Sequence, residues 1–242
     1  MLRSLATTVA LAVAAIVFAV TTADAAPPQL QAAVSPITIY GNLGTVNAST
    51  TSNTVGYLNG TQQNQFQAQG FSVGNQLGSS AWDIKEIQLG LGSSGNPSPV
   101  VGIYSDFFSI NGAVPGSLLA TFTGTTAVSS KGIYTFTGSF TAQENTSYWV
   151  VLSNANSAAE ESYEWYSNDA FTQPTQQNAS NINYLGTKER DGLAGTWNST
   201  LPSLSIGVNA VAAVPEPSTY ALAVVAGVLG ACKAARRRAT QA

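Results

Sequence analysis

The chain of 242 residues contains no histidine and a single cysteine, Cys232. Without histidine it cannot form Ser-His-Asp or Cys-His nucleophilic sites, histidine-ligated zinc sites or a histidine pH switch. A lone cysteine supplies neither an intrachain disulfide nor a thiolate metal cluster. We therefore expect a protein without a cofactor.

Charged residues are also scarce, at 9% of the chain, and they are unevenly placed. Between Pro27 and Val214, four cationic residues stand against ten carboxylates, which leaves this body with a net charge of −6. A protein that binds nucleic acid through the phosphates carries a basic surface instead. We expect no nucleic-acid partner.

The N-terminal segment has the layout of a secretory signal peptide. One positive charge, at Arg3, precedes an apolar run from Leu5 to Val20. Ala23 and Ala25 then occupy the two small-residue positions that signal peptidase reads, so the sequence predicts export and cleavage after residue 25. A buried Ala-rich helix or an N-terminal anchor is the alternative, because the run approaches the ~20 residues of a membrane-spanning helix.

A second apolar segment, Tyr220–Cys232, lies between a proline-containing stretch and a basic cluster. At about 1.5 Å per helical residue it reaches roughly 20 Å, short of the ~30 Å hydrocarbon core of a bilayer. The positive-inside rule keeps the arginines at 236–238 in the cytoplasm and everything before Pro215 outside. Pro215 and Pro217 block helix formation and present Glu216 in an extended segment that a protease can bind. This pattern predicts a marginal, processable membrane segment within residues 211–242.

The Pro-Glu-Pro sequence, the short apolar segment and the basic cluster resemble the PEP-CTERM sorting signal. Pro215, Glu216 and Pro217 match its motif, residues 220–232 its transmembrane part and residues 233–238 its basic tail. The resemblance implies a substrate of an exosortase, a membrane-embedded cysteine protease or transpeptidase of Gram-negative bacteria that make exopolysaccharide. It also implies transient anchoring in the inner membrane, then the cell surface or extracellular matrix. A plain C-terminal tail anchor is the alternative.

Apolar and polar residues alternate through much of the body, and turn residues follow each run. Phe66 and Ala68 alternate with glutamines, and Ser147–Leu152 is apolar on both faces, which favours a central strand. The predicted strands lie near residues 66–73, 87–91, 101–103, 119–122, 133–136, 147–152, 163–167, 182–185 and 204–208. The sequence thus predicts an all-β fold over residues 65–210, an antiparallel, jelly-roll-like β-sandwich between the signal peptide (1–25) and the sorting helix. Residues 26–64 are predicted to be a loosely ordered polar lead with a possible edge strand at residues 37–40.

Five short sequences in the body resemble, in their order and spacing, the choice-of-anchor R domain. They lie at residues 89–94, 101–106, 115–120, 132–136 and 148–152. The resemblance covers approximately residues 54–209 and implies a surface-exposed β-domain. It assigns no catalytic residue.

Aromatic residues and carboxylates gather between residues 160 and 171, a pattern that suits sugar binding. Tyr163, Trp165, Tyr166 and Asp169 are the candidate glycan-binding residues, because rings stack on sugar C–H bonds and carboxylates accept bonds from hydroxyls. A glycosidase would need two carboxylates about 5–5.5 Å or 6.5–9.5 Å apart. Its candidates are Glu160, Glu161, Glu164 and Asp169. We favour the interpretation that these are solvated loop charges beside core aromatic rings, with sugar binding as the alternative, and we predict no enzyme.

Asp106 is a weak calcium candidate, because carboxylate oxygens in loops are ligands that this ion prefers. Other oxygen donors are Asp83, Asn111, Asp169 and Asp191, but no Asp-x-Asp-x-Asp-Gly spacing is present. Turn residues that bond their own backbone are the alternative. Tyr148 and Trp149 are predicted to lie in the core.

The sequence therefore predicts an exported protein of the cell surface or exopolysaccharide matrix, structural or adhesive in role. Its processing partners would be signal peptidase and an exosortase, and the membrane contact would be limited to the C-terminal segment before processing. A lectin-like carbohydrate-binding module is the alternative, with extracellular polysaccharide as partner. A glycoside hydrolase is the third hypothesis.

Overall fold

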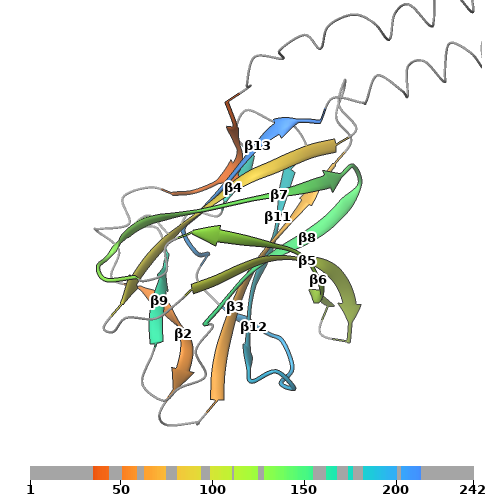
Figure 1. The fold of residues 1–242 in the computed structure, drawn as a ribbon. Helices are drawn as coiled ribbons and strands as arrows, with labels where there is room; N and C mark the ends of the chain where they lie inside the picture. Colours follow the sequence, from red (N-terminus) through yellow and green to blue (C-terminus); the bar gives the residue numbers. More distant parts are fainter. Residues whose placement is uncertain are drawn as a thin grey trace, which may run out of the picture. The chain divides into compact units, whose positions relative to one another are not determined.

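Alternating side chains give the described part of the chain an antiparallel all-β fold (Figure 1). The computed structural model describes residues 35–43, 51–58, 63–74, 81–93, 99–110, 112–124, 128–154, 162–167, 174–176, 182–200 and 203–213. All of them belong to one compact unit, Ser35–Ala213. These residues form strands and turns, and they include no helix capable of crossing a membrane. The predicted signal peptide and sorting segment lie outside the described residues.

Thirteen strands make up the sheet within these ranges. They are β1 (Ile37–Gly41), β2 (Ser52–Leu58), β3 (Gln63–Val73), β4 (Ala81–Ser93), β5 (Pro99–Ser109), β6 (Gly112–Gly124), β7 (Gly132–Gln143), β8 (Thr146–Asn154), β9 (Ser162–Tyr166), β10 (Thr175–Gln176), β11 (Ile182–Asp191), β12 (Asn198–Thr200) and β13 (Ile206–Ala212). The prediction of an all-β, antiparallel fold is confirmed.

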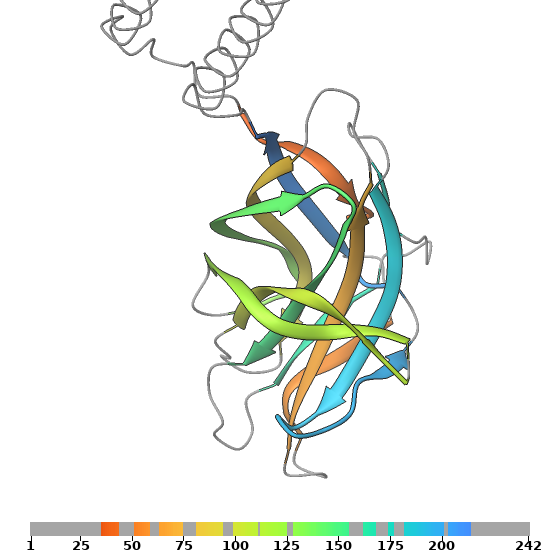
Figure 2. The same ribbon diagram turned by 90° about the vertical axis from the view of Figure 1, so that its right-hand side faces the viewer.

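Eight of the strands form a closed circuit of pairings. It runs β4–β7–β6–β5–β8–β3–β2–β9 and returns to β4. From β4 the sheet also continues through β13 and β1 to β10, and from β3 it continues through β11 to β12. Figure 2 shows β1 and β13 side by side, at the opposite sequence ends of the unit.

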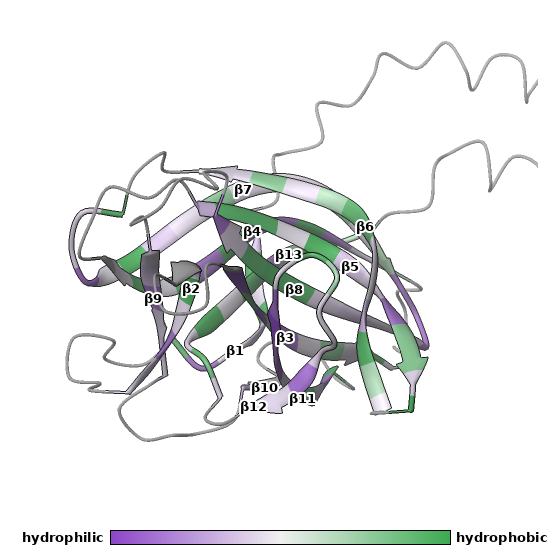
Figure 3. Cartoon of the chain, turned by 90° about the horizontal axis from the view of Figure 1, so that it is seen from below, coloured by the Kyte–Doolittle hydropathy of each residue, from purple (hydrophilic) through white to green (hydrophobic). Residues whose placement is uncertain are grey.

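The main core is built from the inward-facing residues of these strands, and Figure 3 shows hydrophobic and hydrophilic bands alternating along β5 and β7. Along β4, Ile84, Ile87 and Leu89 are all fully buried although a strict alternation would separate Ile84 from the other two. A register shift in the β4–β7 pairing between Ile84 and Glu86 accounts for this. The irregularity changes which face the next residues occupy, so both parts of β4 contribute to one core.

Strand β8 is central and buried on both faces, as predicted. Tyr148, Val150 and Leu152 join the main core. Trp149 and Val151 point the other way into a second cluster. That second cluster also contains Phe66, Ala68, Val114 and Trp197. The predicted core positions of Tyr148 and Trp149 are confirmed, since they are 4% and 0% exposed.

Two glutamines of β3 are buried although they alternate with the apolar residues of the strand. Gln67 and Gln69 are both 0% exposed. The Gln69 side chain accepts a hydrogen bond from the Leu204 backbone N–H (2.7 Å) and donates one to the Leu204 carbonyl (3.2 Å). Because buried polar groups are stable only when paired, this exchange lets an amide side chain join β3 to the segment that precedes β13.

The possible strand predicted at residues 37–40 is present as β1, but the rest of the predicted loose lead is more ordered than expected where the structure describes it. β1 and β2 both lie in that region, and β1 pairs with both β10 and β13. Ile39 and Tyr40 are fully buried, and the Tyr40 hydroxyl donates to the Gly70 carbonyl at 3.2 Å. Composition left the order of this region open because short Ser- and Thr-rich strands depend on their tertiary pairing.

Candidate functional site

Two of the predicted sugar-binding rings lie in the core. β9 alternates between partly buried and buried residues, so Tyr163 and Trp165 face inward at 1% and 0% exposure. The Trp165 indole N–H donates to the Ser205 carbonyl at 2.9 Å, and the Tyr163 hydroxyl donates to the Ser153 carbonyl. The hypothesis that these two rings face a sugar is therefore wrong, and the favoured interpretation of core aromatic rings is confirmed for both. The physical reason is the alternation along β9, which points both rings toward the interior.

Tyr166 and Glu164 lie on the other face of β9, where they bind each other. The Tyr166 hydroxyl donates to the Glu164 carboxylate, and the Lys131 ammonium lies 4.1 Å from the centroid of the Tyr166 ring. Burial, and then the hydrogen bond and the charge of Glu164, raise the pKa of Tyr166 to about 12. The lysine covers one face of the Tyr166 ring. Asp169, Glu160 and Glu161 lie outside the described residues.

Strongly alkaline solution is expected to unfold this protein through its buried tyrosines. Burial raises the pKa of Tyr40 and Tyr163 well above the ordinary value of 10.0, and the charge of Tyr184 adds to the effect on Tyr40. The unfolded chain releases these protons near pH 10, whereas the folded state retains them. The contribution of these two tyrosines to the free energy of unfolding is therefore complete below about pH 10. It falls as the pH rises further.

Tyrosinate absorbance and circular dichroism, recorded together from pH 9 to 12, check this expectation. The buried tyrosines should ionise only as the β-sheet signal is lost. A Tyr163→Phe variant should show a shallower loss of stability above pH 10. Full tyrosine ionisation near pH 10 with an unchanged sheet signal would contradict the burial of these groups.

Asp106 has a partner that the sequence did not suggest. The Trp149 indole N–H donates to its Oδ1 atom at 2.7 Å. Among the described residues, no three acidic or cysteine side chains are grouped so that they could hold a metal ion. The structure therefore places Asp106 beside a tryptophan rather than among other carboxylates, and its calcium hypothesis gains no further ligand.

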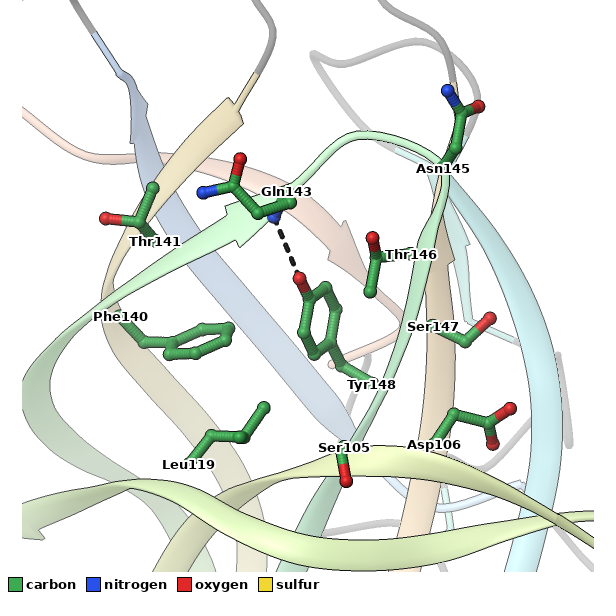
Figure 4. A pocket seen from close by; sticks show the side chains of 10 residues that line it. All are labelled: Ser105, Asp106, Leu119, Phe140, Thr141, Gln143, Asn145, Thr146, Ser147 and Tyr148. Carbon is green, nitrogen blue, oxygen red and sulfur yellow. Dashed lines mark hydrogen bonds between the residues drawn. The ribbon is translucent and has the colours of Figure 1, made fainter.

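Asp106 instead lines an open groove of about 580 Å³ at one end of β8 (Figure 4). The groove lies where β6 and β7 diverge, because within the described residues these strands pair at Thr123–Gly124 and Phe136–Thr137 alone. Residues from β5 and β6 line one wall, and residues from β7 line the other. The first residues of β8 and the turn before it complete the lining, which consists of Ser105, Asp106, Leu119, Phe140, Thr141, Gln143, Asn145, Thr146, Ser147 and Tyr148.

One side of the groove is apolar. Phe140 and Tyr148 meet edge to face, with ring centroids 5.1 Å apart and planes at 79°. Leu119 lies beside them and is 46% exposed. The Tyr148 hydroxyl accepts a hydrogen bond from the Gln143 backbone N–H at 2.9 Å, which holds the ring in place.

The other side of the groove is polar, and Figure 4 shows Asp106, Ser147 and Asn145 there. Asn145 belongs to the two-residue turn between β7 and β8 and has a φ of 56°. Asparagine tolerates this left-handed conformation better than most residues. The turn therefore presents an exposed amide at the rim of the groove.

This groove was not predicted from the sequence. Asp106 was singled out for calcium, whereas Phe140 and Asn145 were not identified as site residues. The Glu144–Asn145 pair between two alternating runs was a usable sign of a hairpin turn. Nothing in the sequence indicated that residues near positions 106, 119 and 140 would line one groove. They surround the same space only because β6 and β7 separate there in the tertiary structure.

No protein-family model matches the chain, and it matches neither a curated protein nor a solved structure. The PEP-CTERM and choice-of-anchor R resemblances therefore remain predictions from the sequence. The chemistry of the groove follows from its own side chains: one carboxylate, amides, hydroxyls and a partly exposed aromatic ring.

Proposed function

We propose that this chain is a secreted, non-enzymatic protein of the cell surface or exopolysaccharide matrix, with a structural or adhesive role. In this proposal signal peptidase removes residues 1–25 and an exosortase-type enzyme acts at the C-terminal signal. The observation that carries the proposal is the order of Pro-Glu-Pro (215–217), an apolar segment (220–232) and three arginines (236–238).

The positions of the strands support this processing. β1 begins at Ile37, after the predicted signal-peptidase site at Ala23 and Ala25. β13 ends at Ala212, three positions before Pro215. Removal of both predicted signals would therefore leave every described strand whole, as a passenger domain requires.

Within this proposal the β-unit is a jelly-roll-like sandwich. One layer would contain β1, β13, β4 and β7, and the other β5, β8, β3 and β11, in the order of their pairings. The support is that both sets of strands contribute to the same main core, for example Leu89 and Val208 from the first and Val150 and Phe71 from the second. Two sheets that pack face to face share their inner side chains in this way.

Mature protein from the cell surface is expected to lack both ends. Intact-mass measurement should show no residues before Ala26 and no arginine tail at 236–238. Alanine substitutions at Pro215, Glu216 and Pro217 should leave the tail attached. Alanine substitutions at Ser218 and Thr219 are the matched control, and the tail of that variant should still be removed. Surface material that carries the intact tail in the unsubstituted chain would refute processing by an exosortase-type enzyme.

Carbohydrate binding is the second candidate function, and the groove is the observation that favours it. Protein sites for sugars combine an apolar surface for C–H bonds with fixed polar groups for hydroxyls. The groove has both on opposite sides of Tyr148. A glycan-binding domain would also suit an adhesive role in a polysaccharide matrix.

A further inference from the structure

We propose that the groove between β6 and β7 binds a stretch of uncharged polysaccharide, with Asp106 and Asn145 bonding its hydroxyls and Phe140 packing on a sugar ring. This inference rests on the proposed matrix function and names the ligand class for its adhesive role. It also moves the glycan site from β9, where the rings are buried, to the groove.

The charge of the groove selects against anionic glycans. Among the residues that the structure describes, Asp106 is the one charged residue in the lining, which includes no lysine or arginine. A uronate or sulfate group would meet this carboxylate, and no cationic residue of the described lining offsets the repulsion. The net charge of −6 between Pro27 and Val214 acts in the same direction.

Asp106 is held in position for hydroxyl recognition. Its Oδ1 atom accepts the hydrogen bond from the buried Trp149 indole, and this contact fixes the orientation of the carboxylate. Its Oδ2 atom has no hydrogen-bond partner within the described ranges and remains available to accept. Hydrogen bonds from a hydroxyl to a carboxylate are shorter and stronger than those between neutral groups.

The apolar side of the groove is also preorganised. Phe140 rests on the edge of Tyr148, which is itself fixed by the Gln143 backbone, so the ring has little freedom to lose on binding. Leu119 extends this surface from the opposite wall. Three of the lining hydroxyls are engaged elsewhere: Thr141 donates to Asp83 at 2.6 Å, Thr146 donates to the Glu144 carbonyl at 3.1 Å, and Ser105 accepts from the Ser117 backbone N–H at 3.0 Å. Asp106, Asn145 and Phe140 are the groups that we assign to the ligand, with the Ser147 hydroxyl beside them.

Retention of the full-length chain, in mild detergent, on immobilised polysaccharides tests the inference. The probes are neutral mannan and dextran, with alginate as the polyuronate contrast. We expect retention on at least one neutral polysaccharide and none on alginate. Asp106→Asn preserves an oxygen for the Trp149 indole yet removes the charge, and we expect it to weaken binding about tenfold.

Phe140→Ala is expected to weaken binding by a similar factor, and Phe108→Ala is its matched control. Phe108 lies in β5, is 81% exposed and is absent from the described lining of the groove, so its removal should leave binding unchanged. Thermal melting of each variant separates lost binding from lost folding. Asp106→Asn provides the decisive test if Phe140→Ala fails to fold.

Three results would overturn the inference: no retention on either neutral polysaccharide, stronger retention on alginate, or unchanged binding by a folded Asp106→Asn variant. Failure here is distinct from failure of the proposed function, because that function is tested by the masses of the mature ends. A correctly processed chain without glycan retention would reject only the glycan site.

Discussion

A Trp165→Ala variant is expected to lose about 3–5 kcal/mol of unfolding free energy, the usual cost of removing a large buried ring. Trp165 is 0% exposed and belongs to the main core. It lies on β9, which pairs with β2 on one side and β4 on the other. The cavity accounts for most of the cost. The Ser205 carbonyl that binds the indole also accepts from the Gly90 backbone N–H at 3.1 Å, so it keeps one partner after the substitution.

Urea unfolding of the variant series measures this effect. Trp165→Phe retains most of the ring and should cost only about 1–2 kcal/mol, because it loses one hydrogen bond and little volume. Leu193→Ala is the surface control. Leu193 is 80% exposed, so the stability of this variant should match that of the unsubstituted chain. A Trp165→Ala variant as stable as the Leu193→Ala control would contradict the burial of this ring.

Adding one methyl group at Gly124 is expected to destabilise the fold by about 1–3 kcal/mol, as overpacking does in other tightly packed sites. A Cβ atom at this position would lie 2.5 Å from the Thr135 carbonyl oxygen and 2.7 Å from a carbon of the Phe136 ring. Gly124 pairs with Phe136 at the short junction where β6 and β7 still touch. The backbone of that junction must move to admit the methyl group.

The same substitution should also weaken glycan retention, because the groove widens from this junction. Gly132→Ala is the matched control on β7. The nearest contact of its Cβ atom is a Tyr134 ring carbon at 3.9 Å, which is ordinary van der Waals separation, so we expect a change within about 0.5 kcal/mol. Thermal melting of the two variants side by side is the measurement. Equal stability of Gly124→Ala and Gly132→Ala would show that the β6–β7 junction accommodates a methyl group without strain, which would contradict the expected overpacking.

Local patterns in the sequence were sufficient to predict the fold class and several core positions. Alternation with a period of two residues predicts strands wherever one face is buried. A run that is apolar at every position predicts a strand with both faces covered, and β8 is such a strand. The export and sorting signals are also properties of the linear sequence, although they lie outside the described residues and remain predictions.

Tertiary pairing decided what those patterns left open. Alternation shows that a strand has two faces but does not show which face is inward. The sequence therefore left open whether Trp165 or Tyr166 is buried, and the pairing of β9 with β2 and β4 decides it. The glutamines of β3 alternate with apolar residues in the sequence, yet Gln69 is buried because the Leu204 backbone satisfies its amide.

The groove depended on tertiary structure most of all. Its residues come from β5, β6, β7 and β8, and they surround one space because antiparallel register joins these strands at one end and lets β6 and β7 separate at the other. The sequence by itself determined that strands form and which of them are most buried. Only long-range pairing determined which rings are covered and which polar groups meet at a surface, because those outcomes depend on register between residues far apart in the chain.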